Sequence, residues 1–438
     1  MLQLTNSRSD PKCALLTLGC KVNQYESQEM REQLEGAGYR IVDADGTADL
    51  FIVNTCAVTQ AAEKKCRQII RRVAARCPAA MIVVTGCMAQ RAGTELKRIS
   101  ERLIILGNME KDRILSYLEG GASCATDGLS NCQSYLGRGI AAWSGRARAC
   151  VKIQDGCNRN CSYCLVPQVR GGLRSRPAQA VYDEIRRLAE NGFREVVLTG
   201  IHLGLYDERA GDGLAKLLDN LPEVEGIVNI RLSSIEPIDF TSDLLRVIEK
   251  DDRICNHVHV PLQHGSDRIL REMRRPYSAN DYACIIDKLR AVRPGLAVTT
   301  DIMVGFPGED DTAFQESLTF VRCMAFAGLH VFRYSPRPGT PAAVMPDQVT
   351  ERVKSIRAEE MSQTAFCAAD EYLSALEDEE LRLVVEAIDD SVCMGRTDRY
   401  VEAEVRSEAD FHIGDVIRIK AIGKCNGRLL GKALKKVL

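Results

Sequence analysis

Three cysteines near the middle of the chain have a spacing suited to an iron–sulfur cluster. They lie in the segment Cys157-Asn-Arg-Asn-Cys161-Ser-Tyr-Cys164, which has a C-x3-C-x2-C pattern. Such a cluster needs several soft thiolates that a tight loop brings close together. Because only three cysteines are present, a [4Fe–4S] cluster held here would keep one iron open for a substrate or cofactor.

Two other interpretations compete with a cluster at this triplet. Positions i, i+4 and i+7 line one face of a helix, so the cysteines could simply be buried in a core. A structural zinc site is the second alternative, but it requires four ligands and no fourth lies nearby in the sequence. Turn-forming residues crowd the segment and favour a loop over a helix; they are Gly156, Asn158, Asn160 and Pro167.

Three more cysteines end short apolar runs in the first part of the chain. Cys20, Cys56 and Cys87 close the runs at 14–20, 50–56 and 81–87. Such runs are typical of buried parallel strands, and helix-like stretches at 25–35 and 61–75 separate them. Because ligands gather beyond the carboxyl ends of parallel strands, we expect the three cysteines to converge on one site.

The elements that must position the central triplet form a repeating pattern between 147 and 346. Strand-like runs alternate there with helix-like runs, as in βα units. Right-handed crossovers would curl six such units into an open, partial barrel whose active site lies at the carboxyl ends of the strands. The six expected strands are 148–153, 195–199, 228–233, 257–261, 297–304 and 329–334.

The end of the chain has a different character. Residues 350–375 resemble a charged amphipathic helix, and the short alternating runs LRLVVEAI, RYVEAEV, DVIRIKAI and GRLLGKAL follow it. These runs predict a small antiparallel barrel. Residues 411–438 hold seven Lys and Arg residues against the single Asp415, which predicts a local positive surface.

The fold class predicted from these patterns is α/β with three domains. An N-terminal parallel-sheet domain at 11–120 precedes a Gly/Ser-rich linker at 121–146. A partial (β/α)6 barrel at 147–376 and a small β-barrel at 377–438 complete the chain.

Composition sets limits on the class of protein. The 438 residues include 58 Lys and Arg against 60 Asp and Glu, and 45% are hydrophobic, which excludes a disordered or low-complexity chain. The sequence shows neither a secretory leader nor an apolar run long enough to span a bilayer, so the expected compartment is the cytoplasm, with no membrane partner. Disulfides are rare in that compartment, so 18 cysteines indicate metal or redox roles for some of them.

The central triplet, with Tyr163 before its third cysteine, resembles the signature of the radical S-adenosylmethionine (SAM) superfamily. Together with the three N-terminal cysteines, it makes nearly the whole chain similar to the methylthiotransferase family of radical SAM enzymes. Further segments that match this family are 151–157, 175–177, 198–204, 231–237, 261–267, 301–309 and 334–340.

The resemblance implies cofactors, ligands and partners. One [4Fe–4S] cluster would lie on Cys157, Cys161 and Cys164, and an auxiliary one on Cys20, Cys56 and Cys87. SAM would bind the open iron of the first cluster, with contacts from Tyr163, Gly200, Ser234 and Glu236. The C-terminal barrel would be an RNA-binding, OB-like TRAM domain that holds the tRNA anticodon arm. A flavodoxin- or ferredoxin-class protein would supply electrons.

The branch of the family is indicated by Lys21-Val-Asn-Gln-Tyr-Glu26, supported by Cys56-Ala-Val-Thr59 and Thr199-Gly-Ile-His-Leu203. These segments resemble the branch that inserts a methylthio group at C2 of N6-threonylcarbamoyladenosine at tRNA position 37. The alternatives are the branches acting on isopentenyladenosine or on a ribosomal protein, and a non-catalytic iron–sulfur RNA-binding protein. No side chain beyond the cluster ligands is expected to be catalytic.

The remaining cysteines and histidines predict little chemistry. Twelve cysteines lack cluster spacing and are interpreted as buried or incidental, although Cys124 and Cys132 could form a redox pair in the linker. His257 and His259 alternate on one expected strand and are interpreted as part of a polar barrel interior rather than as metal ligands. The twelve cysteines are Cys13, Cys66, Cys77, Cys124, Cys132, Cys150, Cys255, Cys284, Cys323, Cys367, Cys393 and Cys425.

Overall fold

A computed structural model of the chain describes residues 10–120, 124–126, 129, 135, 137–207, 213–406 and 410–437. The chain forms two compact units. Unit 1 comprises Met1–Ile140, Gln154–Arg176 and Ser335–Thr340, and unit 2 comprises Ala141–Ile153, Pro177–Tyr334 and Pro341–Leu438. The domain limits expected from the sequence stay a prediction. No helix among the described residues is long and apolar enough to cross a membrane.

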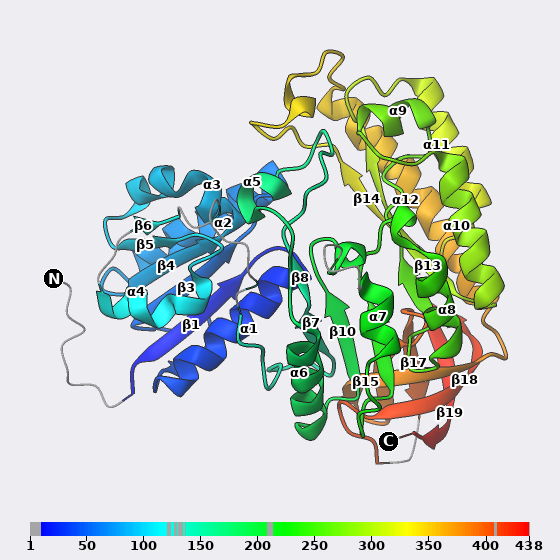
Figure 1. Cartoon of the computed structure of the whole chain (residues 1–438), viewed down its shortest axis with the longest axis horizontal. Coiled ribbons are helices and arrows are strands. Elements are labelled where there is room, and N and C mark those ends of the chain that lie inside the picture. Colours follow the sequence, from blue (N-terminus) through cyan, green and yellow to red (C-terminus); the bar gives the residue numbers. More distant parts are fainter. Residues whose placement is uncertain are drawn as a thin grey trace. The chain divides into compact units, whose positions relative to one another are not determined.

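Unit 1 is built on a six-stranded parallel sheet with the order β2-β1-β3-β4-β5-β6 (Figure 1). Its strands are β1 (Lys12–Thr17), β2 (Arg40–Ile41), β3 (Leu50–Thr55), β4 (Met81–Gly86), β5 (Leu103–Leu106) and β6 (Cys124–Ala125). The helices between them are α1 (Lys21–Gly36), α2 (Gln60–Arg76), α3 (Cys87–Leu96) and α4 (Ile114–Gly120). The short β6 lies in the segment that the sequence presents as a linker.

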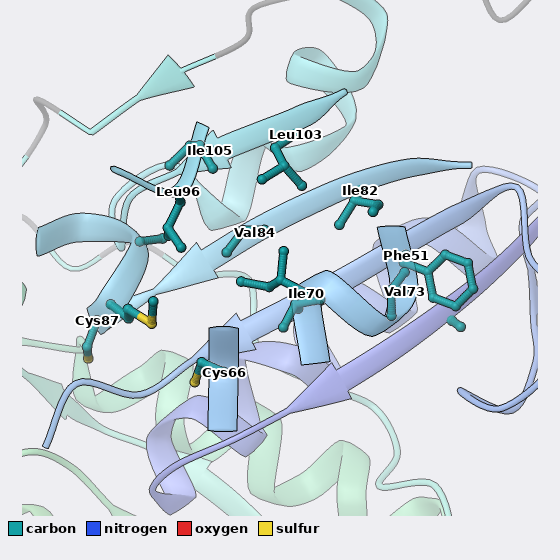
Figure 2. Packing of buried hydrophobic residues seen from close by; sticks show 14 of the residues in the cluster. Phe51, Cys66, Ile70, Val73, Ile82, Val84, Cys87, Leu96, Leu103 and Ile105 are labelled. Atoms are coloured by element: carbon teal, nitrogen blue, oxygen red, sulfur yellow. The ribbon is translucent and has the colours of Figure 1, made fainter. Parts of the chain in front are cut away.

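Alternate residues of the unit 1 strands enter two separate hydrophobic clusters. In β3, Phe51 and Val53 belong to one cluster, whereas Leu50 and Ile52 belong to the other. Figure 2 shows the first cluster, in which Phe51, Ile82 and Val84 of the strands pack with residues of α2 and α3. Burial on both faces explains why these strands are continuous apolar runs without polar alternation.

Unit 1 also contains the loop that carries the central cysteines. This segment includes β8 (Gln154–Asp155), which pairs antiparallel with β9 (Arg174–Ser175). Between them lie the loop itself and the short helix α5 (Val166–Arg170).

Unit 2 begins with six parallel strands arranged in chain order. Two three-stranded sheets, β11-β10-β7 and β12-β13-β14, are joined by parallel bridges from Ile230 to Ile254 and from Ser234 to His259. The strands are β7 (Ala149–Lys152), β10 (Glu195–Thr199), β11 (Asn229–Leu232), β12 (His257–His259), β13 (Ala297–Val304) and β14 (Gly328–Arg333). This order confirms the predicted partial barrel.

Helices connect these strands and cover the sheet (Figure 1). Several of these helices begin with a side-chain cap: Ser278 and Asp281 form a capping box, and Thr241 and Asp310 cap their own helices. The helices are α6 (Ala178–Glu190), α7 (Gly213–Asp219), α8 (Ser242–Lys250), α9 (Asp267–Glu272), α10 (Ala279–Val292) and α11 (Asp311–Cys323).

The chain ends with α12 (Glu351–Ser374) and a closed barrel of order β15-β16-β17-β19-β18. The strands are β15 (Glu380–Asp389), β16 (Val392–Thr397), β17 (Glu402–Arg406), β18 (Val416–Cys425) and β19 (Arg428–Lys436). The small C-terminal barrel is therefore confirmed. It differs in two details from the prediction, because β16 was not expected and β17 pairs with β19 in parallel.

Within unit 2, buried polar contacts join this small barrel to the strands of the larger one. Arg231 of β11 forms an ion pair with the buried Glu195 at 2.7 Å and donates hydrogen bonds to the backbone oxygens of Thr397 and Asp398. The ring of Tyr400 stacks on His257, with 4.5 Å between centroids. Truncating the small barrel would leave this buried ion pair without its hydrogen-bond acceptors, so point variants are better tests of its role.

Candidate iron–sulfur cluster sites

The three N-terminal cysteines lie beyond the carboxyl ends of neighbouring strands in unit 1. Cys20 caps α1 shortly after β1 ends, Cys56 follows β3 directly, and Cys87 is the first residue of α3, directly after β4. Since β1, β3 and β4 are adjacent in the sheet, the fold brings the three thiols to one edge.

The Cys56 thiol lies close to the other two. Burial, with smaller contributions from the nearby Cys87 and Cys20, raises its pKa to about 12. Gly19 allows this close packing, because it has φ +110° and a Cβ added there would lie 3.3 Å from Cys56 Sγ. The backbone therefore keeps the space beside Cys56 free of a side chain.

The central cysteines lie in a compact loop between β8 and α5. The Cys157 backbone N–H donates to the oxygen of Gly171 at 3.0 Å, and the Cys164 N–H donates to the oxygen of Cys161 at 3.1 Å. All three side chains are partly buried. These contacts close the loop at both ends and hold its cysteines in one small region.

Backbone N–H groups point at the sulfur atoms of both cysteine sets. The backbone N–H of residue 58 donates to Cys56 Sγ at 3.5 Å. The backbone N–H groups of residues 159 and 166 donate to Cys157 Sγ and Cys164 Sγ, each at 3.4 Å. The Asn108 side-chain amide donates to Cys87 Sγ at 3.8 Å. Hydrogen bonds to cluster sulfurs stabilise their negative charge and tune the reduction potential.

These features fit iron–sulfur clusters better than single metal ions. In a cubane each thiolate binds a different iron, so its cysteines lie farther apart than the ligands of one ion. Among the described residues, no three of these cysteines bring their sulfur atoms within 4.8 Å of one another. All six are free thiols. The residues present therefore fit two clusters, one for each set of three.

A glycine at the start of the central loop supplies a specific test. Gly156 has φ +73°, and a Cβ added there would lie 2.0 Å from the oxygen of Gly172. Gly156→Ala should therefore distort the loop and lose about half of the bound iron, because only one of two four-iron clusters depends on it. Iron per chain, measured after reconstitution, checks this.

The matched control for that variant is Gly172→Ala, between α5 and β9. Nothing lies within 4 Å of a Cβ added at Gly172, and its φ is outside the left-handed region. This variant should keep its iron, and equal iron contents in the two variants would contradict the assigned role of the loop.

A buried ion network links the elements that carry the two cysteine sets. Arg170, at the end of α5, is 1% exposed and binds both carboxylate oxygens of Glu26 on α1, at 2.8 and 3.1 Å. It also donates to Asp155 of β8 at 3.0 Å and to Asn23 of α1 at 2.6 Å. One guanidinium thus connects the helix that Cys20 caps with the helix that follows Cys164.

The same network reaches the strand ends and Cys87. Asn23 donates to the backbone oxygens of Leu18 at 2.8 Å and Thr55 at 3.0 Å, next to Cys20 and Cys56. Lys111 forms a buried ion pair with Glu26. Burial lowers the pKa of Lys111, whereas Glu26 and, more weakly, Cys87 raise it. Cationic groups therefore lie where thiolates bound to a cluster would need compensating charge.

Sequence reasoning did not single out this network. Asn23 and Glu26 lie within a segment used only to choose the family branch, and nothing in the sequence marks Arg170 or Lys111 as their partners. The one available signal was the i, i+3 spacing of Asn23 and Glu26, which places both on the same face of the helix that begins after Cys20.

The residues predicted to contact SAM belong to both units. In unit 2, Gly200 follows β10, and Ser234 and Glu236 follow β11, so these three lie at the carboxyl ends of adjacent strands. Glu236 forms an ion pair with Arg275. Tyr163 lies in the cysteine loop of unit 1, directly before Cys164. Their contact with SAM stays a prediction.

The other described cysteines do not form a further set. Five are buried, namely Cys13, Cys66, Cys77, Cys255 and Cys393, and Cys150 is half-buried. Burial raises the pKa of Cys13 and of Cys255 to about 12, which makes these thiols poor nucleophiles. The exposed ones are Cys124, Cys284, Cys323, Cys367 and Cys425. Cys132, and with it the redox pair considered for Cys124, lies outside the described residues.

The C-terminal segment 411–438, here called the basic tail, has less unpaired positive charge than its sequence indicates. Five of its seven basic residues form ion pairs with acidic residues, most of them on other elements. Lys432 and Lys435 are exposed and form no ion pair within the described part of the chain. The paired residues are Arg418, Lys420, Lys424, Arg428 and Lys436.

Comparisons with known proteins agree with this architecture. Residues 12–107 match the family model "Uncharacterized protein family UPF0004", and residues 151–321 match "Radical SAM superfamily". The fold is similar to that of the radical SAM methyltransferase TsrM from Kitasatospora setae, with a TM-score of 0.57, 15% identity, and coverage of 76% of this chain and 75% of that one. The fold and the central loop thus define a radical SAM protein.

Two curated relatives show which family of radical SAM proteins the chain belongs to. Threonylcarbamoyladenosine tRNA methylthiotransferase MtaB of Bacillus subtilis is 39% identical over 421 residues, which cover 93% of each chain. The protein of the same name from Thermotoga maritima is 36% identical over 93% of this chain and 94% of its own. The chain belongs to the family of threonylcarbamoyladenosine tRNA methylthiotransferases.

Proposed function

We propose that this protein inserts a methylthio group at C2 of N6-threonylcarbamoyladenosine, at position 37 next to the tRNA anticodon. The observation that carries the proposal is the 39% identity to a methylthiotransferase of this name over 93% of both chains. The two sets of three cysteines in unit 1 support it, because the reaction requires both a radical source and a sulfur donor.

The cysteines would hold the cofactors that this chemistry needs. When bound, a [4Fe–4S] cluster on Cys157, Cys161 and Cys164 supplies the electron that cleaves SAM, and one on Cys20, Cys56 and Cys87 supplies the site for sulfur. An aromatic C–H bond offers no acid, base or nucleophile a point of attack, so the cofactors carry the chemistry and the protein orients them.

The roles of the protein's own residues follow from the contacts around the cysteines. Backbone N–H groups at residues 58, 159 and 166 orient and polarise the sulfurs. Arg170 fixes α1 against α5 and supplies positive charge beside the auxiliary set. Gly200, Ser234 and Glu236 would contact SAM at the carboxyl ends of their strands, and Tyr163 would contact it from the cluster loop.

Nucleoside analysis of bulk tRNA tests the proposed reaction. Cells that lack the gene should lose 2-methylthio-N6-threonylcarbamoyladenosine and accumulate its precursor, as measured by mass spectrometry. If the cells lost the methylthio derivative of isopentenyladenosine instead, the protein would belong to the branch of the family that acts on isopentenyladenosine. If no nucleoside changes and SAM is not cleaved under reducing conditions, the clusters only brace an RNA-binding fold.

The partners of the reaction are proposed by the same reasoning. The C-terminal barrel would hold the anticodon arm, where position 37 is unpaired and open to stacking and edge contacts. A low-potential protein of the flavodoxin or ferredoxin class would deliver electrons. The protein would act in the cytoplasm, where its tRNA substrate is found.

Lys432 and Lys435 of β19, which form no ion pair with the described residues, supply a test of tRNA binding. The double variant Lys432→Ala/Lys435→Ala should reduce the slope of log affinity against log salt by about 1.5, since each lost phosphate contact contributes about 0.7–0.9. Binding of unmodified anticodon-arm RNA, measured over a salt series, checks this.

A control with the same change in charge is Lys288→Ala/Arg322→Ala. These exposed residues lie on α10 and α11, which cover the larger barrel. The control should keep the slope of the unmodified protein. If the salt dependence of RNA affinity had the same slope in both double variants, Lys432 and Lys435 would not contact the RNA.

A further inference from the structure

Three side chains from neighbouring strands of unit 2 meet on one face of the sheet. His259 lies on β12, Asp301 on β13 and His330 on β14. Asp301 pairs in register with His330, and His259 pairs with Thr299, two residues before Asp301. Because side chains two residues apart in a strand share a face, this register places all three side chains on the same side.

The ligand atoms of this triad lie close together. One nitrogen of each histidine and one carboxylate oxygen all lie within 4.8 Å of one another. His259 Nε2 is 3.4 Å from Asp301 Oδ2, and His330 Nδ1 is 3.1 Å from Asp301 Oδ1. Ligands that lie about 2.0–2.2 Å from one metal ion are themselves about 3.0–3.5 Å apart in tetrahedral or octahedral geometry.

A second layer of contacts orients His259. Its Nδ1 lies 2.9 Å from the hydroxyl of Thr299, which leaves Nε2 directed toward Asp301. The same hydroxyl is 2.8 Å from Nε2 of His257, whose ring is stacked on Tyr400. Histidines that bind metals almost always use their second ring nitrogen in this way, which fixes the ring orientation.

The triad is also accessible from one side. The side chain of His259 is 12% exposed, that of Asp301 25% and that of His330 63%. This exposure leaves room for water or an added oxygen ligand at an ion. Two imidazoles and one carboxylate with open positions are typical of zinc and of non-haem iron(II) sites.

We propose that His259, Asp301 and His330 form a binding site for a divalent transition-metal ion of the Zn²⁺ or Fe²⁺ class. The site includes none of the six cluster cysteines, and it revises the interpretation of His259 as a polar filler of the barrel interior. His257 keeps that structural role, because its contacts are with Thr299 and Tyr400. The opposing model is a hydrogen-bonded triad in which Asp301 accepts from both rings and no metal binds.

Zinc binding to the full-length, cluster-loaded protein distinguishes the two models. Equilibrium dialysis against ZnCl₂ under anaerobic conditions, with zinc and iron measured together, should give one zinc per chain without loss of iron. Asp301→Asn keeps the size of the side chain and removes the anionic ligand, and His259→Ala removes an imidazole. Both variants should weaken zinc binding at least about 100-fold.

The matched control is His412→Ala, which removes an exposed histidine beside Asp415 in the small barrel. This variant should bind zinc like the unmodified protein. No zinc uptake, or uptake unchanged in both triad variants, would overturn the proposal. Zinc uptake that accompanies iron loss and persists in Asp301→Asn would assign the ion to the cysteines and would also overturn it.

Discussion

Replacing Cys161 with alanine should abolish the reductive cleavage of SAM. The central loop holds only three cysteines, so a cluster left with two of them would lose both stability and its open iron. Under anaerobic conditions, 5′-deoxyadenosine formed with dithionite should fall to the level found without reductant. A higher yield would remove Cys161 from the ligand set.

A variant in the other cysteine set should show the opposite behaviour. Cys56→Ala should keep SAM cleavage and lose the methylthio product, because it removes a ligand only from the auxiliary set. Cys66→Ala controls for the loss of a buried thiol nearby, since Cys66 Sγ donates to the backbone oxygen of Cys56 at 3.7 Å. This control should keep both activities. A methylthio product from Cys56→Ala would contradict the auxiliary role.

Most of the fold could be predicted because its strands are distinctive in the sequence. The expected strands at 195–199 and 297–304 coincide with β10 and β13, because β-branched and other apolar residues make up most of both segments. β16 was not predicted because Gly395 interrupts its pattern and suggests a turn. The structure explains this glycine, because a Cβ there would lie 1.9 Å from the oxygen of Val384 on β15.

The sites could be predicted only where their residues are close in sequence or repeat a pattern. The central triplet spans eight residues, and the N-terminal cysteines repeat one strand-end pattern. Arg170 and Glu26, by contrast, lie 144 positions apart, and the metal triad depends on the register of three strands. The ion pairs of the tail were missed for the same reason, because most of the acidic partners lie on other elements.

Removing the charge of Arg170 should have the largest effect on stability. Arg170→Met removes the cation that Glu26 and Asp155 share. Breaking a buried ion pair costs about 3–5 kcal/mol, and we expect the lower end of this range because Glu26 keeps Lys111 and Asp155 keeps Arg174. Hydrogen exchange of the peptides that contain α1 and α5 should therefore accelerate even without clusters. The surface variant Arg31→Met, which breaks an exposed pair with Glu35 on α1, should cost less than about 1 kcal/mol.

A double variant distinguishes the loss of the ion pair from simple loss of packing. Glu26→Gln removes the main acceptor of Arg170, so combining it with Arg170→Met should destabilise unit 1 by about 1–3 kcal/mol less than the sum of the two single variants. Additive effects would mean that Arg170 only fills space. Because Arg170 connects the helix capped by Cys20 to the helix that follows Cys164, Arg170→Met should also lower the iron retained by both cysteine sets. Retention of all iron despite the lost stability would show that the two sets do not depend on this contact.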